Sequence, residues 1–306
     1  MKSHVVIGAD VGGSHITSAA VDLHSGKIIA GSSYKQKVNA AAAPDEIITC
    51  WANAIKASMT ASEGAIEAIG IAMPGPFDYP NGISYISGLA KYESLYGLNV
   101  GELLKEELKF PGEIYFENDA SCFGIGESWQ GEGAGFKRVV VATLGTGLGG
   151  AFVINCEAQK SGAGVPEDGY LFKLPYKQGI AEDYISSRWL IETFNAETGN
   201  QVAEVKEINE LALTGNIAAQ QLFSEMGTML GEVLAPWLTA FDAQCLVVGG
   251  NVRKAHPFFL PSVKNVFETN HVNTGVYIST KGEESAIVGA AYLCRQFFVP
   301  KTTTVK

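Results

Sequence analysis

An apolar strand, a glycine turn and a second apolar strand follow one another twice in this chain, once in each half. The first copy is VVIGADVGGSHITSAAVD at positions 5–22, and the second is RVVVATLGTGLGGAFVINC at positions 138–156. An approximate duplication of this kind predicts two related domains that face one another. The chain has 306 residues, of which 46% are hydrophobic, so it is long enough to build two α/β cores.

Apolar periodicity and turn residues predict the order of the remaining elements. In the first half, we expect a strand at Val5–Gly8, a β-meander up to Val38, a helix from Pro44, a strand at Ala68–Ala72, a helix at 100–110, a strand ending at Asn118 and a helix from Ala120. In the second half, the second strand pair is followed by an irregular stretch at 157–181. Helices are then expected at 182–194, 216–241, 257–269 and from Glu284, and strands at 245–250 and 276–279. No Ser-rich or Pro-rich linker is present, so we expect a compact domain junction near residue 118.

Composition excludes several classes of function. The net charge is −10 and no Lys/Arg block occurs, which argues against a nucleic-acid partner. No apolar run reaches the ~20 residues that span a bilayer, and the chain opens on a strand rather than a signal peptide. The five cysteines are scattered without C-x-x-C spacing, which is typical of buried, reduced thiols. We therefore expect a cytoplasmic protein without a membrane partner.

Three glycine turns, at 12–14, 145–150 and 249–250, each follow a strand. Any one of them is compatible with an ordinary hairpin. Glycine also lets backbone N–H groups approach an anion closely, so three such turns together favour phosphate binding. The chain contains neither G-x-x-x-x-G-K-[ST] nor a G-x-G-x-x-G that leads from strand to helix. The turns therefore indicate a nucleotide held by hairpins rather than by a P-loop or a dinucleotide fold.

These stretches resemble a known superfamily. IGADVGGSHITSAAVD and VVVATLGTGLGGAFV resemble the two phosphate loops of the actin, sugar-kinase and heat-shock-chaperone superfamily, and CLVVGGNV is similar to its adenosine-binding turn. GIAMPGPFD, ENDASCFGIGE and LGTGLGGAFV together resemble the ROK group of sugar kinases and repressors. The resemblance covers nearly the whole chain.

The resemblance implies an α/β fold of two actin-like (ribonuclease H-like) domains. Each domain would have a mixed sheet flanked by helices, with nucleotide and sugar in the cleft between them. The predicted domains are residues 1–118, joined by a C-terminal helix at about 285–306, and residues 119–284. The resemblance also implies a glucokinase-like enzyme, ATP and Mg²⁺ as cofactors, and a homodimer.

The resemblance assigns roles to individual residues. Asp10 would lie beside the transferred phosphoryl group and hold Mg²⁺, directly or through water. Asp119 would be the general base for the sugar hydroxyl, although it also suits the N-terminal cap of the helix that follows. The residues expected to bind ATP phosphates or adenosine are Gly12, Gly13, Ser14, Thr17, Gly145, Thr146, Gly147, Gly249 and Gly250.

The expected sugar-binding residues come from both halves. They are Gly75, Asn118, Asp119, Glu167, Tyr170 and Glu182. Glu167 and Glu182 would accept hydrogen bonds from neighbouring hydroxyls, although a solvated loop acid and a helix N-terminal acid are the plainer interpretations. Tyr170 stands where the ROK pattern has histidine, which leaves the identity of the sugar open.

Many ROK members bind a structural zinc through that histidine and a cysteine cluster. The corresponding stretch here, LFKLPYKQGIAED, contains neither Cys nor His, and the five histidines of the chain are dispersed. Zinc requires closely spaced thiolate or imidazole ligands, so we predict no zinc. Packing by Phe172, Leu174 and Tyr176 is the expected substitute.

The favoured function is ATP-dependent phosphorylation of a hexose or N-acetylhexosamine, at the 6-hydroxyl. One alternative is a sugar-responsive transcriptional repressor. The phosphate loop begins at residue 8, which leaves no room for an N-terminal helix-turn-helix, and the chain is acidic. The other alternative is a sugar sensor without turnover, which the tyrosine at position 170 leaves open.

Overall fold

The computed structural model describes residues 4–62 and 64–298. The chain forms two compact units. The first contains the residues up to Gln130 together with those from Glu283 onward, and the second contains Gly131–Gly282. The chain therefore passes from the first unit to the second after α3 (Asp119–Gln130) and returns at the start of α9 (Glu283–Phe298).

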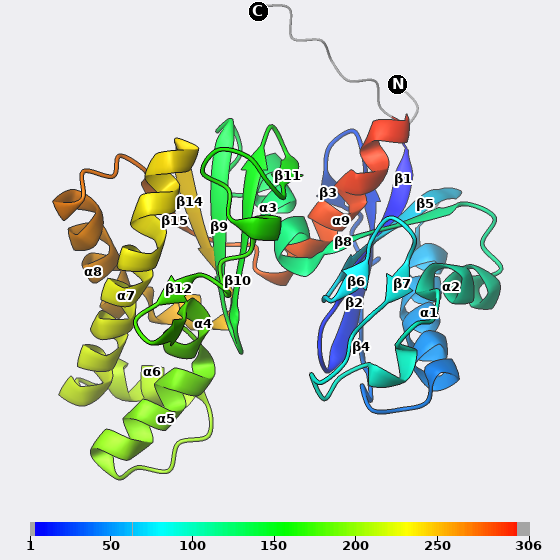
Figure 1. Ribbon diagram of the computed structural model, residues 1–306. Helices are drawn as coiled ribbons and strands as arrows, with labels where there is room; N and C mark the ends of the chain where they lie inside the picture. The colour runs from blue at the N-terminus through cyan, green and yellow to red at the C-terminus, as the bar shows by residue number, and fades with distance from the viewer. Residues whose placement is uncertain (1–3, 63, 299–306) are drawn as a thin grey trace, which may run out of the picture. The chain divides into compact units, whose positions relative to one another are not determined.

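The first unit has a mixed sheet in the order β3-β2-β1-β5-β8, with β4 also paired to β2 (Figure 1). Its strands are β1 (Val5–Val11), β2 (His15–Asp22), β3 (Lys27–Ile28), β4 (Tyr34–Lys37), β5 (Ile66–Met73) and β8 (Glu113–Asn118). β1 and β2 are antiparallel, whereas β1, β5 and β8 are parallel. The carboxyl ends of these three parallel strands consequently lie at one edge of the sheet.

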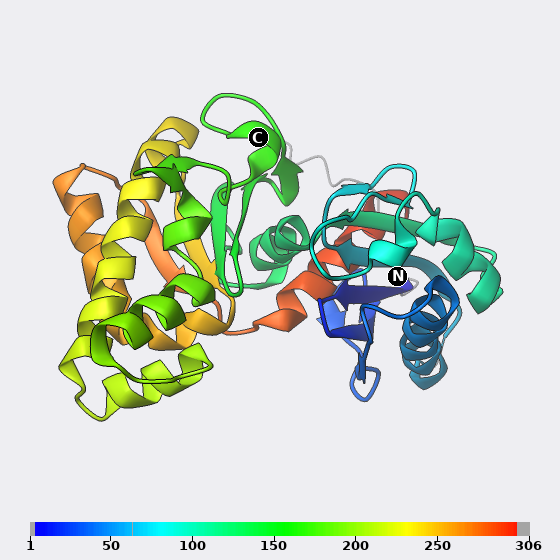
Figure 2. The same ribbon diagram turned by 60° about the horizontal axis from the view of Figure 1, so that its bottom comes forward.

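Helices cover both faces of this sheet. α1 (Pro44–Ala61) and α2 (Val100–Leu108) cover one face, and α1 buries Ile47, Trp51 and Ile55 as its helical spacing predicts. α9 (Glu283–Phe298) lies on the other face beside α3 (Asp119–Gln130) (Figure 2).

The division between the units differs from the predicted junction near residue 118 by one helix. α3 follows residue 118, but it packs along α9 in the first unit. The buried Glu127 of α3 accepts a hydrogen bond from Ser285 of α9 at 2.6 Å. A buried carboxylate needs such a partner, so α3 stays with the first unit.

The second unit repeats the arrangement with a sheet in the order β11-β10-β9-β14-β15. Its strands are β9 (Arg138–Leu144), β10 (Leu148–Ile154), β11 (Glu157–Gln159), β14 (Cys245–Gly249) and β15 (Gly275–Ile278). β9 and β10 are antiparallel, and β14 runs parallel to β9. β9–β10 therefore corresponds to β1–β2, and the predicted α/β class with a mixed sheet in each half is confirmed.

Helices of the second unit pack on its sheet around an apolar core. They are α4 (Ala181–Tyr184), α5 (Ser187–Thr198), α6 (Val205–Leu213), α7 (Ile217–Phe241) and α8 (His256–Thr269). The expected stripe of α7 is buried at Leu222, Met226, Leu230 and Val233, whereas Trp237 is only partly buried.

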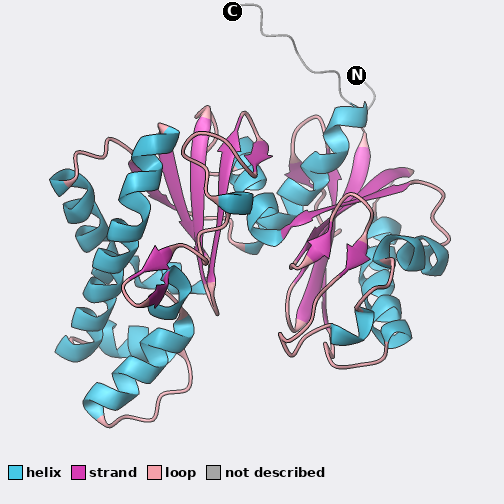
Figure 3. Cartoon of the chain, in the orientation of Figure 1, coloured by secondary structure: helices cyan, strands magenta, loops and turns pink. Residues whose placement is uncertain are grey.

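Three sequence-based expectations differ from the structure. The helix expected at 182–194 is two helices, because Ser186 leaves the helical conformation and caps α5 through the N–H of Trp189. The stretch at 157–181 contains β11 and a small hairpin of β12 (Pro175–Tyr176) and β13 (Gly179–Ile180), and the first unit has a similar one in β6 (Phe77–Asp78) and β7 (Ile83–Ser84) (Figure 3).

The third difference concerns the cysteines. All five are free, but only Cys122, Cys245 and Cys294 are buried, and Cys50 and Cys156 are partly exposed.

Within residues 4–62 and 64–298, no helix is long and apolar enough to cross a bilayer.

Candidate functional site

Asp10 lies inside the first strand pair rather than beyond its end. The expected strand stops at Gly8, but β1 continues to Val11 because β2 pairs with it along its whole length. Asp10 stands directly opposite Thr17 in this pair. Opposite residues of an antiparallel pair project to the same face, so the carboxyl and hydroxyl groups share one side of the sheet. It is the side of Val6, which α9 covers.

The Asp10–Thr17 pair is electrostatically unsatisfied. Thr17 Oγ1 is buried and makes no hydrogen bond with any described residue. Burial is the main cause that raises the pKa of Asp10 from 3.8 to about 7. The negative charges of Asp119 and Glu283 add to this rise, and Lys35 opposes it. A half-buried carboxyl group with a raised pKa, beside a buried hydroxyl without a partner in the described residues, is suited to receive a cation or a polar ligand.

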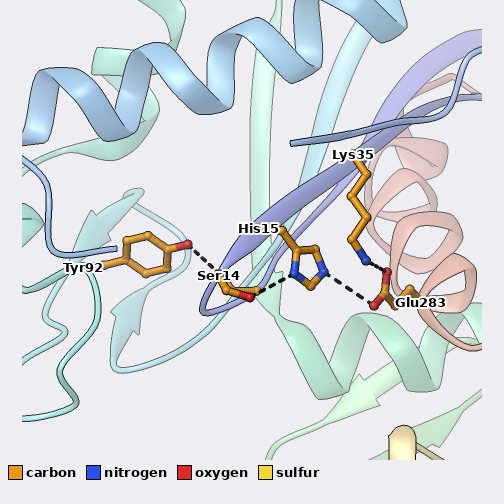
Figure 4. Close-up of polar contacts among 6 residues, drawn as sticks. Ser14, His15, Lys35, Tyr92 and Glu283 are labelled. Carbon is orange, nitrogen blue, oxygen red and sulfur yellow. Dashed lines mark hydrogen bonds and ion pairs between the residues drawn. The ribbon is translucent and has the colours of Figure 1, made fainter. Parts of the chain in front are cut away.

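The turn of this hairpin presents its tip to solvent. The Gly12 N–H donates to the carbonyl of His15 at 2.9 Å, which leaves Gly13 and Ser14 exposed at the tip. From one side, the buried Tyr92 donates its hydroxyl to the Gly12 carbonyl at 2.5 Å (Figure 4). The backbone of the turn is thereby fixed while its outward groups stay open.

On the other side, His15 links the hairpin to α9 (Figure 4). Its Nδ1 lies 3.3 Å from Ser14 Oγ and its Nε2 lies 3.5 Å from Glu283 Oε1. The second oxygen of Glu283 pairs with Lys35 Nζ at 2.9 Å. No local sequence pattern indicates a role for Tyr92, His15, Lys35 or Glu283, because their contacts join positions up to 248 residues apart.

Asp119 begins α3 directly after β8, at the same sheet edge as Asp10. Asp10 pairs with Ala72 of β5, and Ala72 pairs with Glu117 of β8. The strands that carry the two aspartates are therefore two strand spacings apart, or about 10 Å. The effect of the Asp119 charge on the pKa of Asp10 agrees with this proximity.

Asn118 rather than Asp119 caps α3. Asn118 Oδ1 accepts hydrogen bonds from the N–H groups of Ala120 and Ser121 at 3.0 and 3.2 Å. Its Nδ2 donates to Asp119 Oδ1 at 2.9 Å and to Tyr79 Oη at 3.3 Å. Asp119 is exposed. Its Oδ1 accepts hydrogen bonds from Asn118 Nδ2 and from the Ala120 N–H, and its Oδ2 makes no hydrogen bond to the described residues. The geometry thus gives Asn118 a supporting role, and its contact with sugar stays a prediction.

Gly75 lies in the turn that follows β5, the strand between β1 and β8. This half-buried glycine is therefore close to the edge at which the two aspartates stand. Of the expected site residues, the first unit holds Asp10, Gly12, Gly13, Ser14, Thr17, Gly75, Asn118 and Asp119. The second unit holds Gly145, Thr146, Gly147, Glu167, Tyr170, Glu182, Gly249 and Gly250.

The glycine turn of the second unit is braced by α4 and α5. Ser187 donates both its hydroxyl and its backbone N–H to the Gly145 carbonyl, at 2.7 and 2.9 Å. Glu182 Oε2 accepts a hydrogen bond from the Leu148 N–H at 2.9 Å. A Cβ atom on Gly147 would lie 2.0 Å from that oxygen, so only glycine permits this approach. The structure therefore brings Glu182, expected at the sugar, against the glycine turn between β9 and β10.

The two glycine turns of the second unit lie against each other. Gly250 has a φ of 77°, and a Cβ atom there would lie 2.2 Å from the Leu144 carbonyl oxygen. Arg253 Nη1 donates to the Gly250 carbonyl at 2.9 Å, a contact that sequence analysis did not anticipate. Thr146 is exposed at the tip, and a Cβ on Gly145 would meet no described atom within 4 Å. The base of this loop is packed tightly and its tip is open.

Glu167 and Tyr170 lie on and after a short 3-10 turn. Glu167 is exposed there. The Tyr170 ring lies 5.3 Å from that of Phe172, and Lys173 Nζ lies 5.6 Å from the centre of the Tyr170 ring. The two residues are three positions apart in the chain, and both precede Glu182 of α4.

Aromatic packing holds the stretch that corresponds to the family's zinc loop. Tyr176 meets Tyr184 edge to face at 5.5 Å, and Lys177 Nζ lies 5.3 and 5.1 Å from the centres of their rings. Tyr176 also donates its hydroxyl to Glu232, and Leu174 is buried. Within the described residues, no three His, Cys, Asp or Glu side chains are grouped to hold a metal ion.

Comparisons with known proteins agree with the fold. A curated glucokinase from Halalkalibacterium halodurans is 27% identical over 97% of this chain and 96% of its own length. A solved ROK family glucokinase from Streptomyces griseus, in complex with glucose and AMPPNP, is 25% identical with a TM-score of 0.75, over 95% of this chain and 99% of that one. A xylose repressor from Bacillus spizizenii is 23% identical over 86% of this chain and 68% of its own length.

The sequence profile described as the ROK family matches residues 6–297, which span both units and both glycine hairpins. Kinases and a repressor are both among the similar proteins, so the match settles descent and fold rather than activity. The expected resemblance is thereby confirmed: this chain belongs to the ROK family.

Proposed function

We propose that this protein is a sugar kinase that transfers the terminal phosphoryl group of ATP to a hydroxyl of a hexose or an N-acetylhexosamine, at the 6-position. The observation that carries the proposal is the pair of aspartates at one sheet edge. Asp10 is half-buried with its pKa raised to about 7, and Asp119 is exposed with one carboxylate oxygen that makes no hydrogen bond to the described residues. Two carboxyl groups in such different environments suit two different roles.

Asp119 is the general base of the proposed reaction. Its Oδ2 accepts the proton of the sugar hydroxyl while the hydroxyl oxygen forms a bond to the terminal phosphorus and the bond to ADP breaks. Asn118 supports this role, because its amide holds Asp119 Oδ1 at 2.9 Å and its own position is fixed by the helix cap.

The groups around the first hairpin fit a cation that accompanies the phosphates. Mg²⁺ prefers oxygen ligands and is commonly held by one or two carboxylates together with substrate phosphates, so a cluster of three acidic side chains is not required. Asp10 supplies the carboxylate, and the buried Thr17 hydroxyl, which has no hydrogen bond within the described residues, supplies a second oxygen on the same face. When bound, Mg²⁺ would neutralise phosphate charge.

Backbone groups of both glycine hairpins are the proposed phosphate-binding elements. The exposed tips at Gly13–Ser14 and at Thr146 are proposed to donate backbone N–H groups to the phosphates. Glu167 and the second oxygen of Glu182 are proposed to accept hydrogen bonds from sugar hydroxyls, and Tyr170 to contact one end of the ring in place of the family's histidine.

The test is an assay of ADP release with Mg-ATP and a panel of hexoses and N-acetylhexosamines. We expect sugar-dependent ADP release by the parent protein, and a loss of at least about 100-fold in kcat for Asp119→Asn with sugar affinity retained. Asp45→Asn is the matched control, since Asp45 is also an exposed acid in the first turn of a helix. Turnover of Asp119→Asn at the parent rate would remove Asp119 from the mechanism.

A sugar-responsive regulator or sensor is the second candidate, favoured by the similarity to the xylose repressor. Calorimetry with each sugar, beside the ADP assay, separates the two. A protein that binds a sugar but releases no ADP above background in any mixture is a sensor, and the kinase proposal then fails.

A further inference from the structure

Lys91 lies over the tip of the first hairpin. Its Cδ is 3.8 Å from the position that a Cβ on Gly13 would occupy, and apart from Gly13 and its two chain neighbours no other described atom lies within 4 Å of that position. Lys91 is half-buried, and its ammonium group makes no hydrogen bond or ion pair with a described residue. By contrast, Lys35 near the same hairpin is already paired with Glu283 at 2.9 Å. Lys91 therefore brings an uncommitted positive charge to the exposed turn.

The backbone that carries Lys91 is held in an unusual conformation. Ala90 and Tyr92, on either side of it, have φ values of 52° and 55°. Residues with a side chain rarely adopt this left-handed region, and two of them in one segment cost free energy that other contacts must offset. The N–H of Ala90 donates to Glu93 Oε1 at 3.0 Å, which is one such contact.

The strongest contacts of this segment are made by Tyr92. Its side chain is fully buried, its ring meets Trp51 edge to face at 5.0 Å, and its hydroxyl donates to the Gly12 carbonyl. Its backbone N–H donates to the Ala40 carbonyl at 2.7 Å. Tyr92 thus ties the segment to the hairpin, and Lys91 has little freedom to leave the tip. Strain of this kind, maintained by surrounding contacts, is typical of binding sites.

We propose that Lys91 is a phosphate-binding residue whose ammonium group contacts the terminal phosphoryl group of the nucleotide donor. The proposal rests on the proposed function, and it adds a residue that the glycine turns and aspartates do not include. Backbone N–H groups of the hairpin and one lysine then converge on the same anion. The ammonium group of Lys91 would offset part of the negative charge that the donor phosphates bring close to the carboxylates of Asp10 and Asp119.

The test compares nucleotides that differ by the terminal phosphate. Binding of a non-hydrolysable ATP analogue and of ADP, each with Mg²⁺, is measured by calorimetry for the parent, Lys91→Met and Lys91→Arg. We expect Lys91→Met to weaken binding of the ATP analogue by about tenfold or more, as for loss of a charged hydrogen bond, and to leave ADP binding unchanged. Lys91→Arg keeps the charge and retains most of the affinity for the analogue.

Lys264→Met is the matched control, because Lys264 is an exposed lysine on α8 of the second unit. It should bind both nucleotides as the parent does. Unfolding temperatures of all variants are recorded. If Lys91→Met unfolds, the test relies on Lys91→Arg, which must still bind the ATP analogue more tightly than it binds ADP.

The outcomes separate this proposal from the one on which it rests. Equal affinities of Lys91→Met and the parent for the analogue, or an equal loss for the analogue and ADP, would overturn the role of Lys91 while leaving sugar-dependent ADP release intact. A parent protein that binds neither nucleotide overturns the kinase proposal and this one together.

Discussion

The two glycine hairpins occupy equivalent places in their units but are held differently. In the first, Thr17 Oγ1 is buried without a partner in the described residues, and the pKa of Asp10 is raised to about 7. In the second, the Gly145 carbonyl accepts two hydrogen bonds and the Leu148 N–H donates one to Glu182. The first hairpin therefore stores unsatisfied polar groups that a ligand can satisfy, whereas the second is already complete at its base.

This difference has a physical meaning if the proposed phosphoryl transfer takes place at the first hairpin. Polar groups that act on the transferred phosphoryl must be in place, and still without partners, before the substrate binds. Such unsatisfied groups lower the stability of the free protein. A loop that only cradles phosphates through its backbone has no such need. The comparison can be tested by changing one hairpin at a time.

The largest effect is expected from Asp10→Asn. A rise in pKa from 3.8 to about 7 corresponds to a cost on the order of 4 kcal/mol for keeping Asp10 ionised in the folded state. The folded state binds more protons than the unfolded state between these values, so stability falls as pH rises from about 4 to about 7. Asparagine removes this cost and also removes the carboxylate that the proposed reaction uses.

We therefore expect Asp10→Asn to lose sugar-dependent ADP release while its unfolding temperature at pH 8, without Mg²⁺ or nucleotide, rises by several degrees. The gain should shrink as the pH is lowered and disappear near pH 4. Asp45→Asn serves as the control and should show neither change. A variant less stable than the parent at pH 8 would mean that ionised Asp10 does not destabilise the folded protein.

A smaller effect is expected from Gly250→Ala in the second unit. The φ of 77° and the 2.2 Å approach to the Leu144 carbonyl oxygen both oppose a side chain, so we expect a loss of about 3 kcal/mol in the free energy of unfolding. Gly145→Ala is the contrasting variant, because its Cβ meets no described atom within 4 Å. Denaturant titration should show parent-like stability for Gly145→Ala, and equal losses in the two would contradict the tight packing of the loop base.

The smallest effects should come from two hydroxyl deletions, one at each hairpin. Tyr92→Phe removes the donor to the Gly12 carbonyl, and Ser187→Ala removes one of two donors to the Gly145 carbonyl. A single neutral hydrogen bond contributes about 1 kcal/mol, and the remaining N–H of Ser187 reduces the loss at the second hairpin. We expect Tyr92→Phe to raise the KM for ATP more than Ser187→Ala does. The reverse order would show that the second hairpin is the less firmly held.

Local patterns predicted much of this molecule. The two strand–glycine–strand copies, the buried face of α1 and the stripe of α7 follow from alternation, turn residues and helical spacing, and each is present. The predicted end of β1 at Gly8 was wrong, because pairing with β2 extends the strand to Val11.

The remainder depends on contacts between distant residues. The break between α4 and α5 lets Ser187 reach Gly145, 42 positions away, and Tyr92 reaches Gly12 across 80 positions. The left-handed backbone at Ala90 and Tyr92 could not be predicted from the sequence, because neither residue is a glycine. Such features follow from the packed fold and not from any short stretch of sequence.

A crystal structure with Mg²⁺, a non-hydrolysable ATP analogue and the sugar selected by the assay tests the central claim most directly. The account predicts an Asp119 oxygen within hydrogen-bonding distance of the acceptor hydroxyl, and Asp10 facing the cation bound to the terminal phosphate. Carboxyl groups of Asp10 and Asp119 that face separate ligands, neither near the terminal phosphorus, would contradict it.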